Sequence, residues 1–92
     1  MRRVDENQAE IVRALRQIGA KVQSLAELGS GVPDILVGHR GRNYLFEIKS
    51  PKQPPSKRKL TPDEVAWHEA WRGQVAIIEN FGDALKILSS AS

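Results

Sequence analysis

The fold of this chain is decided by residues 31–49, which read GVPDILVGHRGRNYLFEIK. A short apolar run begins directly after Pro33-Asp34, and the segment GHRGR (38–42) is rich in the residues that form tight turns. Residues 43–49, NYLFEIK, then alternate between apolar and polar positions with a period of two, as β-strands do. The pattern predicts two strands joined by a hairpin turn.

The second strand of this hairpin has one apolar face and one charged face, because successive side chains of a strand point to opposite sides. Its apolar face comprises Tyr44, Phe46 and Ile48, and its other face comprises Leu45, Glu47 and Lys49. If the two strands pair across the turn, Asp34 lies opposite the region of Glu47 and Lys49. Three charged groups are therefore expected to converge on one patch of the sheet.

This patch has the composition of a metal-dependent phosphodiesterase site. Partly burying a charged group costs on the order of several kcal/mol per ion unless a partner of opposite charge compensates. A divalent cation held by Asp34 and Glu47 would compensate, since carboxylate oxygens are ligands that Mg²⁺ prefers. Lys49 is not a metal ligand but is placed to offset charge that develops on a phosphate. We expect hydrolysis of phosphodiesters with Mg²⁺, for which Mn²⁺ can substitute.

The rest of the chain predicts a mixed β-sheet flanked by helices, in the order α-β-β-β-α-β-α. Apolar residues recur at helical spacing in the first segment. The sequence Thr61-Pro62-Asp63-Glu64 is a helix start, with Thr61 as the N-cap and Glu64 completing a capping box. The predicted helices are Val4–Ile18, Thr61–Arg72 and Gly82–Leu88, and the predicted strands are Lys21–Leu25, Ile35–Val37, Asn43–Lys49 and Val75–Ile78.

Gln8 is a polar residue within the apolar stripe of the first predicted helix. Glu6 and Glu10, its acidic neighbours, point away from that stripe. Two roles remain open for Gln8: a residue at the edge of the core that bonds to the backbone, or a contributor to the charged patch.

A basic, proline-rich loop follows the charged strand. Residues 49–59, KSPKQPPSKRK, carry five positive charges and no negative one, in a chain with a formal net charge of +3. Basic side chains that contact phosphates release condensed counterions, so such a segment suits nucleic acid, although a solvated basic loop has the same composition. The residues expected to contact DNA are Arg40, Arg42, Lys52, Lys57, Arg58 and Lys59.

Length and composition limit the architecture. A chain of 92 residues without cysteine predicts a single domain, 1–92, with the basic loop at about 50–60 and no disulfide framework. No apolar run approaches the roughly 20 residues that a membrane span requires. Residues 1–8, MRRVDENQ, lack the apolar stretch of a signal peptide. We therefore expect a cytoplasmic protein with no membrane partner.

The sequence resembles a known family at these same positions. Gly31–Gly38 (GVPDILVG), Phe46–Lys49 (FEIK) and Leu60–Pro62 (LTP) are similar to the motifs of the PD-(D/E)XK nuclease superfamily, and more particularly of its VRR-NUC branch. The resemblance covers nearly the whole chain and implies a restriction-endonuclease-like α/β fold. It also implies that the protein is an endonuclease of the short stand-alone type found in phages and bacteria, acting in the cytoplasm of a bacterial or phage-infected cell.

The resemblance assigns roles to individual residues. Asp34 and Glu47 match the metal-binding acids, with the backbone carbonyl of Ile48 as a further ligand, and Lys49 matches the catalytic lysine. Gln8 fits the position at which the family often contributes a carboxylate or glutamine from the first helix. Some members carry a glutamine where this chain has Glu64, which we assign to the helix cap alone. The similarity to Holliday-junction resolvases implies a homodimer acting on branched DNA.

Two other readings of the sequence compete with a nuclease. A non-catalytic or structural DNA-binding module of the same fold would carry the acids as remnants, but Asp34, Glu47 and Lys49 are all intact. An unrelated basic protein that associates with RNA or DNA would need aromatic side chains on an exposed sheet face to stack bases. Trp67 and Trp71, four residues apart on one predicted helix, are more typical of a core or a dimer contact.

Overall fold

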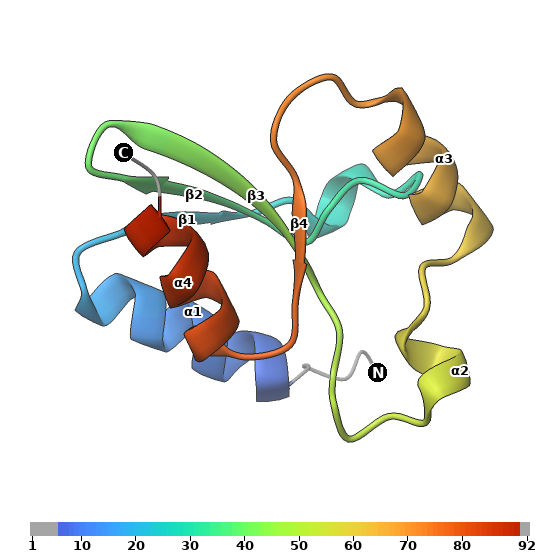
Figure 1. Cartoon of the computed structure of the whole chain (residues 1–92), viewed down its shortest axis with the longest axis horizontal. Coiled ribbons are helices and arrows are strands. Elements are labelled where there is room, and N and C mark those ends of the chain that lie inside the picture. The colour runs from blue at the N-terminus through green and yellow to red at the C-terminus, as the bar shows by residue number, and fades with distance from the viewer. Residues whose placement is uncertain (1–5, 91–92) are drawn as a thin grey trace.

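The computed structural model describes residues 6–90, which form a four-stranded mixed sheet with helices packed beside it (Figure 1). The predicted order of major elements is confirmed, with a 3₁₀ turn and one short helix added to it. The helices are α1 (Glu6–Gln17), α2 (Pro55–Arg58), α3 (Pro62–Ala70) and α4 (Phe81–Ser90), the 3₁₀ turn is η1 (Ala26–Leu28), and the strands are β1 (Lys21–Ser24), β2 (Ile35–His39), β3 (Arg42–Ile48) and β4 (Ala76–Ile78).

The strands lie in the order β1-β2-β3-β4, with β1, β2 and β3 antiparallel and β4 parallel to β3. The β2–β3 hairpin turns at Arg40-Gly41, where both residues have positive φ. Ile35 pairs with Phe46. This register places Asp34, one residue before Ile35, opposite Glu47, as the alternation of the sequence predicts.

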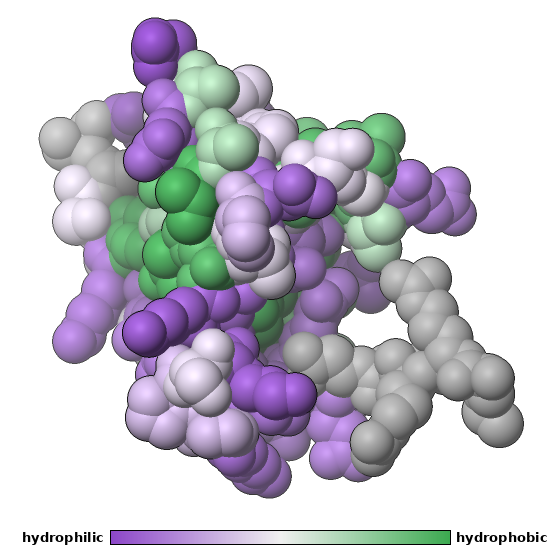
Figure 2. Space-filling view, turned by 90° about the vertical axis from the view of Figure 1, so that its right-hand side faces the viewer, coloured by the Kyte–Doolittle hydropathy of each residue, from purple (hydrophilic) through white to green (hydrophobic). Residues whose placement is uncertain are grey.

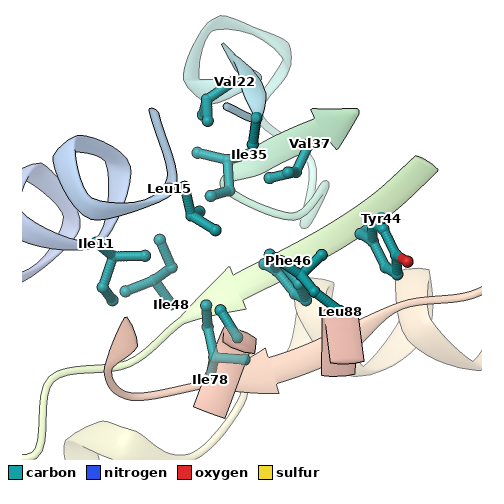
Figure 3. Packing of buried hydrophobic residues seen from close by; sticks show 12 residues of the cluster. Ile11, Leu15, Val22, Ile35, Val37, Tyr44, Phe46, Ile48, Ile78 and Leu88 are labelled. Atoms are coloured by element: carbon teal, nitrogen blue, oxygen red, sulfur yellow. The ribbon is translucent and has the colours of Figure 1, made fainter. Parts of the chain in front are cut away.

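One face of the sheet forms the hydrophobic core. Helices α1 and α4 pack together on this face, whereas α2 and α3 lie to the other side in Figure 1. The core draws one row of side chains from each strand, as Figure 3 shows, and Phe46 and Ile35 are fully buried in it. The principal members are Ile11, Leu15, Val22, Ile35, Val37, Tyr44, Phe46, Ile48, Ile78 and Leu88.

The structure corrects several boundaries of the helices. The predicted start of the first helix, Val4, lies outside the described residues, and α3 ends at Ala70, with Trp71 as its C-cap, before the predicted Arg72. The basic loop is not irregular throughout, because Pro54 has an extended backbone that leads into the short helix α2. Within residues 6–90 no helix is long and apolar enough to cross a membrane.

The capping residues behave as the sequence predicts. The Thr61 hydroxyl accepts from the Glu64 N–H at 3.2 Å, and the Glu64 carboxylate accepts from the Thr61 N–H at 2.8 Å. Asn80 likewise caps α4 through a bond from the Asp83 N–H of 2.8 Å. On α4, Ala84 and Leu88 make the contact with the core, whereas Leu85 is 41% exposed.

Candidate active site

The face of the sheet opposite the core carries a cluster of four charged residues. Asp34 precedes β2, Glu47 and Lys49 belong to the end of β3, and Glu64 lies in the first turn of α3. We call these four residues the carboxylate–lysine cluster. The first three converge as the sequence predicts, and Glu64 is a member that the sequence reasoning assigned only to a helix cap.

Asp34 is fixed by the backbone of the paired strand. Its own N–H donates to the Phe46 carbonyl at 3.0 Å, and its Oδ2 accepts from the Ile48 N–H at 2.6 Å. Both the backbone and the carboxylate of Asp34 are therefore tied to the end of β3. Burial raises the pKa of Asp34 above its ordinary value, although the bond from Ile48 acts in the opposite direction.

Glu47 is a buried carboxyl group at 2% exposure, the most buried charged side chain among residues 6–90. Its Oε1 is buried and accepts no hydrogen bond from the described residues. Burial, together with the neighbouring charge of Asp34, raises the pKa of Glu47 to about 8. A buried acceptor without a donor is costly and uncommon in a folded protein, so this atom is suited to an additional ligand.

Lys49 is held between two carboxylates. Its Nζ lies 2.8 Å from Glu64 Oε1 and 3.5 Å from Glu47 Oε2. Burial alone would lower the pKa of Lys49, but the bond to Glu64 and the charges of Glu47 and Glu64 together raise it. For the acid Glu64, burial acts to raise the pKa. The bonds with Lys49 and Thr61 outweigh burial, so the pKa of Glu64 is lowered. The lysine is thus charged and oriented.

Glu64 reaches the cluster because α3 approaches the loop before β2 very closely. Gly31 has a φ of +81°, and a Cβ at this position would overlap the backbone carbonyl of Asp63 in the first turn of α3. Only glycine combines that backbone conformation with that contact. Gly31 therefore allows the first turn of α3 to pack close to this loop, which brings Glu64 beside Lys49.

The first helix contacts the end of β3 through Asn7, and the role of Gln8 stays a prediction. The Asn7 amide donates to the Lys49 carbonyl at 3.2 Å and to the Glu79 carbonyl at 3.0 Å, so it joins the ends of β3 and β4. Gln8 is half-buried, and within residues 6–90 it forms no hydrogen bond with Asp34, Glu47 or Lys49. The signal for Asn7 was its spacing, because Asn7, Ile11 and Leu15 succeed one another every four residues and form one column.

The predicted DNA-contacting residues divide into two groups. Lys52, Lys57, Arg58 and Lys59 follow the cluster in the loop with α2, where Arg58 Nη1 lies 3.9 Å from Glu79 Oε2. Figure 2, which looks onto the side with α2 and α3, shows hydrophilic residues over the lower part of this surface and hydrophobic residues above them. Arg40 and Arg42 lie at the far end of the hairpin and are not brought to the cluster.

Of the two roles predicted as alternatives for Trp67 and Trp71, a core position or a dimer contact, the structure excludes the core for Trp71. The Trp67 and Trp71 rings stack with centroids 4.7 Å apart, but Trp71 is 42% exposed and is therefore not a core residue. His68 of α3 is half-buried, and its Nε2 has no hydrogen-bond partner in the described chain. The exposed apolar side chains of α3, Val65 and Trp71, therefore belong to the molecular surface beside the cluster.

The cluster fits a divalent cation with few protein ligands. Three carboxylates and one ammonium give a formal charge of −2 when all are ionised. Among residues 6–90 no group of three or more His, Cys, Asp or Glu side chains is arranged to enclose a metal, since Glu64 is bonded to Lys49 and to its own helix cap. Two carboxylates, Asp34 and Glu47, remain, which is the number that Mg²⁺ sites with waters and phosphate oxygens use.

The fold and the cluster together define a nuclease-type domain, and comparison with known proteins shows which one it resembles. A solved structure described as a VRR_NUC domain superposes with a TM-score of 0.67 and 25% sequence identity, covering 95% of both chains. No protein-family model matches the chain, and no curated protein matches it significantly. The resemblance to the VRR-NUC family and its restriction-endonuclease-like α/β fold, both predicted from the motifs, are confirmed by this match.

Proposed function

We propose that this protein is a metal-dependent endonuclease that hydrolyses phosphodiester bonds of DNA, with branched DNA such as Holliday junctions as its preferred substrate. The observation that carries the proposal is the pair of half-buried Asp34 and buried Glu47, with an acceptor that lacks a donor, directly beside a charged lysine. The VRR_NUC fold supports a nuclease, and the net positive charge supports a polyanionic substrate. A non-catalytic DNA-binding module would not need this costly arrangement.

Each residue of the cluster has a separate task in this proposal. Asp34 and Glu47 hold the cation, together with the backbone carbonyl of Ile48, and Mn²⁺ can replace Mg²⁺. When bound, the cation supplies polarisation of the phosphate and activation of water. Lys49 donates to the phosphate oxygens and stabilises the charge that develops there. Because an ammonium has three donors, Lys49 can keep its bond to Glu64 while it binds the phosphate.

Glu64 positions the lysine in this scheme. Its carboxylate is fixed by the Thr61 N–H at 2.8 Å, so it draws Lys49 toward one defined place. Asn7 fixes the carbonyl of Lys49 from the other side of the backbone. Gln8, half-buried one residue further along α1, is retained as a helper that orients water or substrate. Side chain and backbone of the lysine are thus held by different elements.

A cleavage assay tests the proposal. Purified protein is incubated with a four-way junction, a flap, a nicked duplex and a plain duplex, each with Mg²⁺, Mn²⁺ or a chelator. We expect cleavage with either cation, none with chelator, and none by Asp34→Asn or Glu47→Gln, both of which retain DNA binding. Cleavage by contaminant-free protein in chelator would contradict the metal-dependent mechanism, and equal rates on all four DNAs would contradict the preference for branches.

We also propose that the protein acts as a homodimer. Several large apolar side chains are exposed on the open sheet face and on α3, including Leu36, Ile77, Val65 and Trp71. A second copy would cover part of this surface and place two cleavage sites on one substrate. Sedimentation at micromolar concentration should give twice the mass of one chain, and paired incisions in a cruciform plasmid should be coupled. One chain mass with uncoupled nicking would contradict the dimer and leave the nuclease assignment intact.

A further inference from the structure

The charges of this molecule are separated along the β2–β3 hairpin. The carboxylate–lysine cluster lies where β2 begins and β3 ends, and the hairpin turn lies at the opposite end of both strands (Figure 1). The described acids lie in α1, η1, the cluster, α3 and the β4–α4 junction. Within residues 6–90 the charged side chains at the hairpin end are all basic, and of these Lys21 and Arg40 are exposed and form no ion pair with another described residue.

Lys21 lies on the same sheet face as the cluster. Lys21 pairs with Gly38, which in turn pairs with Asn43, so the three positions form one row across β1, β2 and β3. Side chains directly opposite in an antiparallel sheet share a face. Gly38 is four residues from Asp34, and residues an even number apart along a strand also share a face. The row therefore looks out from the open face, not into the core.

Gly38 leaves this row hollow at its centre. A Cβ built on Gly38 would meet no atom within 4 Å, so the space above the backbone is open between Lys21 and Asn43. Arg40 follows two residues later in the turn, has a φ of +52° and is exposed. An open stretch of backbone with a lysine in the strand on one side, an asparagine in the strand on the other and an arginine two residues further on has the chemistry that binds a phosphodiester backbone.

From these observations we infer that the hairpin end is a second contact site for DNA, separate from the cluster and formed by Lys21, Gly38, Asn43 and Arg40. This inference rests on the proposed nuclease function and adds a distance between the cleavage site and a second DNA contact. At about 3.4 Å per residue, the row of Gly38 is roughly 14 Å and Arg40 roughly 20 Å from Asp34. With an axial rise of about 3.4 Å per base pair, that span corresponds to about four to six base pairs of a duplex lying along the hairpin.

The salt dependence of DNA binding tests the inference, measured with chelator so that no cleavage occurs. The double variant Lys21→Gln/Arg40→Asn removes both charges of the hairpin site. Asparagine is chosen at position 40 because it tolerates the left-handed backbone there. The matched control is Arg13→Gln, Lys86→Gln, an exposed arginine and lysine on α1 and α4. Binding to a duplex of about 16 base pairs is followed by fluorescence anisotropy, and circular dichroism confirms that both double variants fold.

The two double variants should differ clearly. Each lost phosphate contact lowers the slope of log K against log salt by about 0.9, so we expect a slope reduced by about 1.8 for the hairpin variant and unchanged for the control. Equal slopes for the two variants would overturn the hairpin site while leaving the nuclease untouched. Absence of binding by the wild-type protein would instead overturn the proposed action on DNA, and with it this inference.

Discussion

The two faces of β3 show how a short chain divides stability from chemistry. Tyr44, Phe46 and Ile48 point into the core and are nearly or fully inaccessible to water. On the other face Glu47 is as buried as a core residue but carries an ionisable carboxyl group, and one of its oxygens has no donor. One face satisfies the rules of a hydrophobic core, and the other violates them. Such a violation within an otherwise consistent fold is typical of a functional site.

The largest effect on stability should come from the core face of this strand. Phe46→Ala removes a fully buried aromatic ring and should reduce the free energy of unfolding by about 3–5 kcal/mol, because the cavity cannot close completely. Leu45→Ala, at the half-buried neighbouring position on the open face, is the matched control and should cost about 1 kcal/mol or less. Urea denaturation followed by circular dichroism measures both. Similar losses for the two variants would contradict the division of the strand into two faces.

The strand pairing could be predicted because its pattern is local. Alternation over 43–49 and the turn at 38–42 fix the register, and the register brings Asp34 opposite Glu47. The contribution of Asn7 could not be found in this way, because it depends on where α1 packs relative to the ends of β3 and β4. The wheel of the helix permits both Asn7 and Gln8 to face inward, and only tertiary packing selects which one reaches the Lys49 carbonyl.

Glu64 escaped prediction because a local explanation already accounted for it. The capping box uses the same Oε1 atom that binds Lys49, so the sequence pattern is complete without the second contact. The link to Lys49 arises from the backbone contact between Gly31 and Asp63, which joins two segments more than 30 residues apart. Nothing in the periodicity of either segment encodes that approach. In the same way, the basic residues of the loop and of the hairpin turn look alike in sequence and lie at opposite ends of the fold.

The next largest effects concern the open face of the sheet, where substitutions in the cluster should slow cleavage. Lys49→Ala should slow single-turnover cleavage by about 10²–10³-fold, as expected when one donor to a transition state is removed, without weakening metal binding. Glu64→Gln keeps an acceptor for the Thr61 N–H but removes the charge beside Lys49, and should slow cleavage by about tenfold, equivalent to about 1.4 kcal/mol. The measurement uses saturating protein, so that affinity for DNA does not enter.

Two controls separate positioning of the lysine from general damage to the fold. Lys86→Ala removes an exposed lysine from α4 and should cleave at the wild-type rate. Thr61→Ala removes the hydroxyl of the capping box and leaves the carboxylate that faces Lys49, so it should lower stability by about 1 kcal/mol but affect the rate less than Glu64→Gln. If Thr61→Ala slowed cleavage more than Glu64→Gln, the role of Glu64 would be confined to the helix cap.

The smallest effect has the opposite sign and concerns Glu47 in the absence of metal. Glu47→Gln removes a buried carboxyl group whose pKa is raised to about 8 and whose Oε1 has no donor, while Lys49 keeps its bond of 2.8 Å to Glu64 and is not left unpaired. In chelator at pH 7 the variant should therefore be more stable than the wild type, by about 1 kcal/mol, because folding no longer has to protonate a carboxyl group that is ionised in the unfolded chain. Added Mg²⁺ should stabilise only the wild type, since a ligand that binds the folded state raises its stability in proportion to its affinity. Thermal unfolding with and without Mg²⁺ measures both changes. A variant less stable than the wild type in chelator would mean that Glu47 supports the fold rather than burdening it, and the argument that its burial serves a bound cation would lose its physical basis.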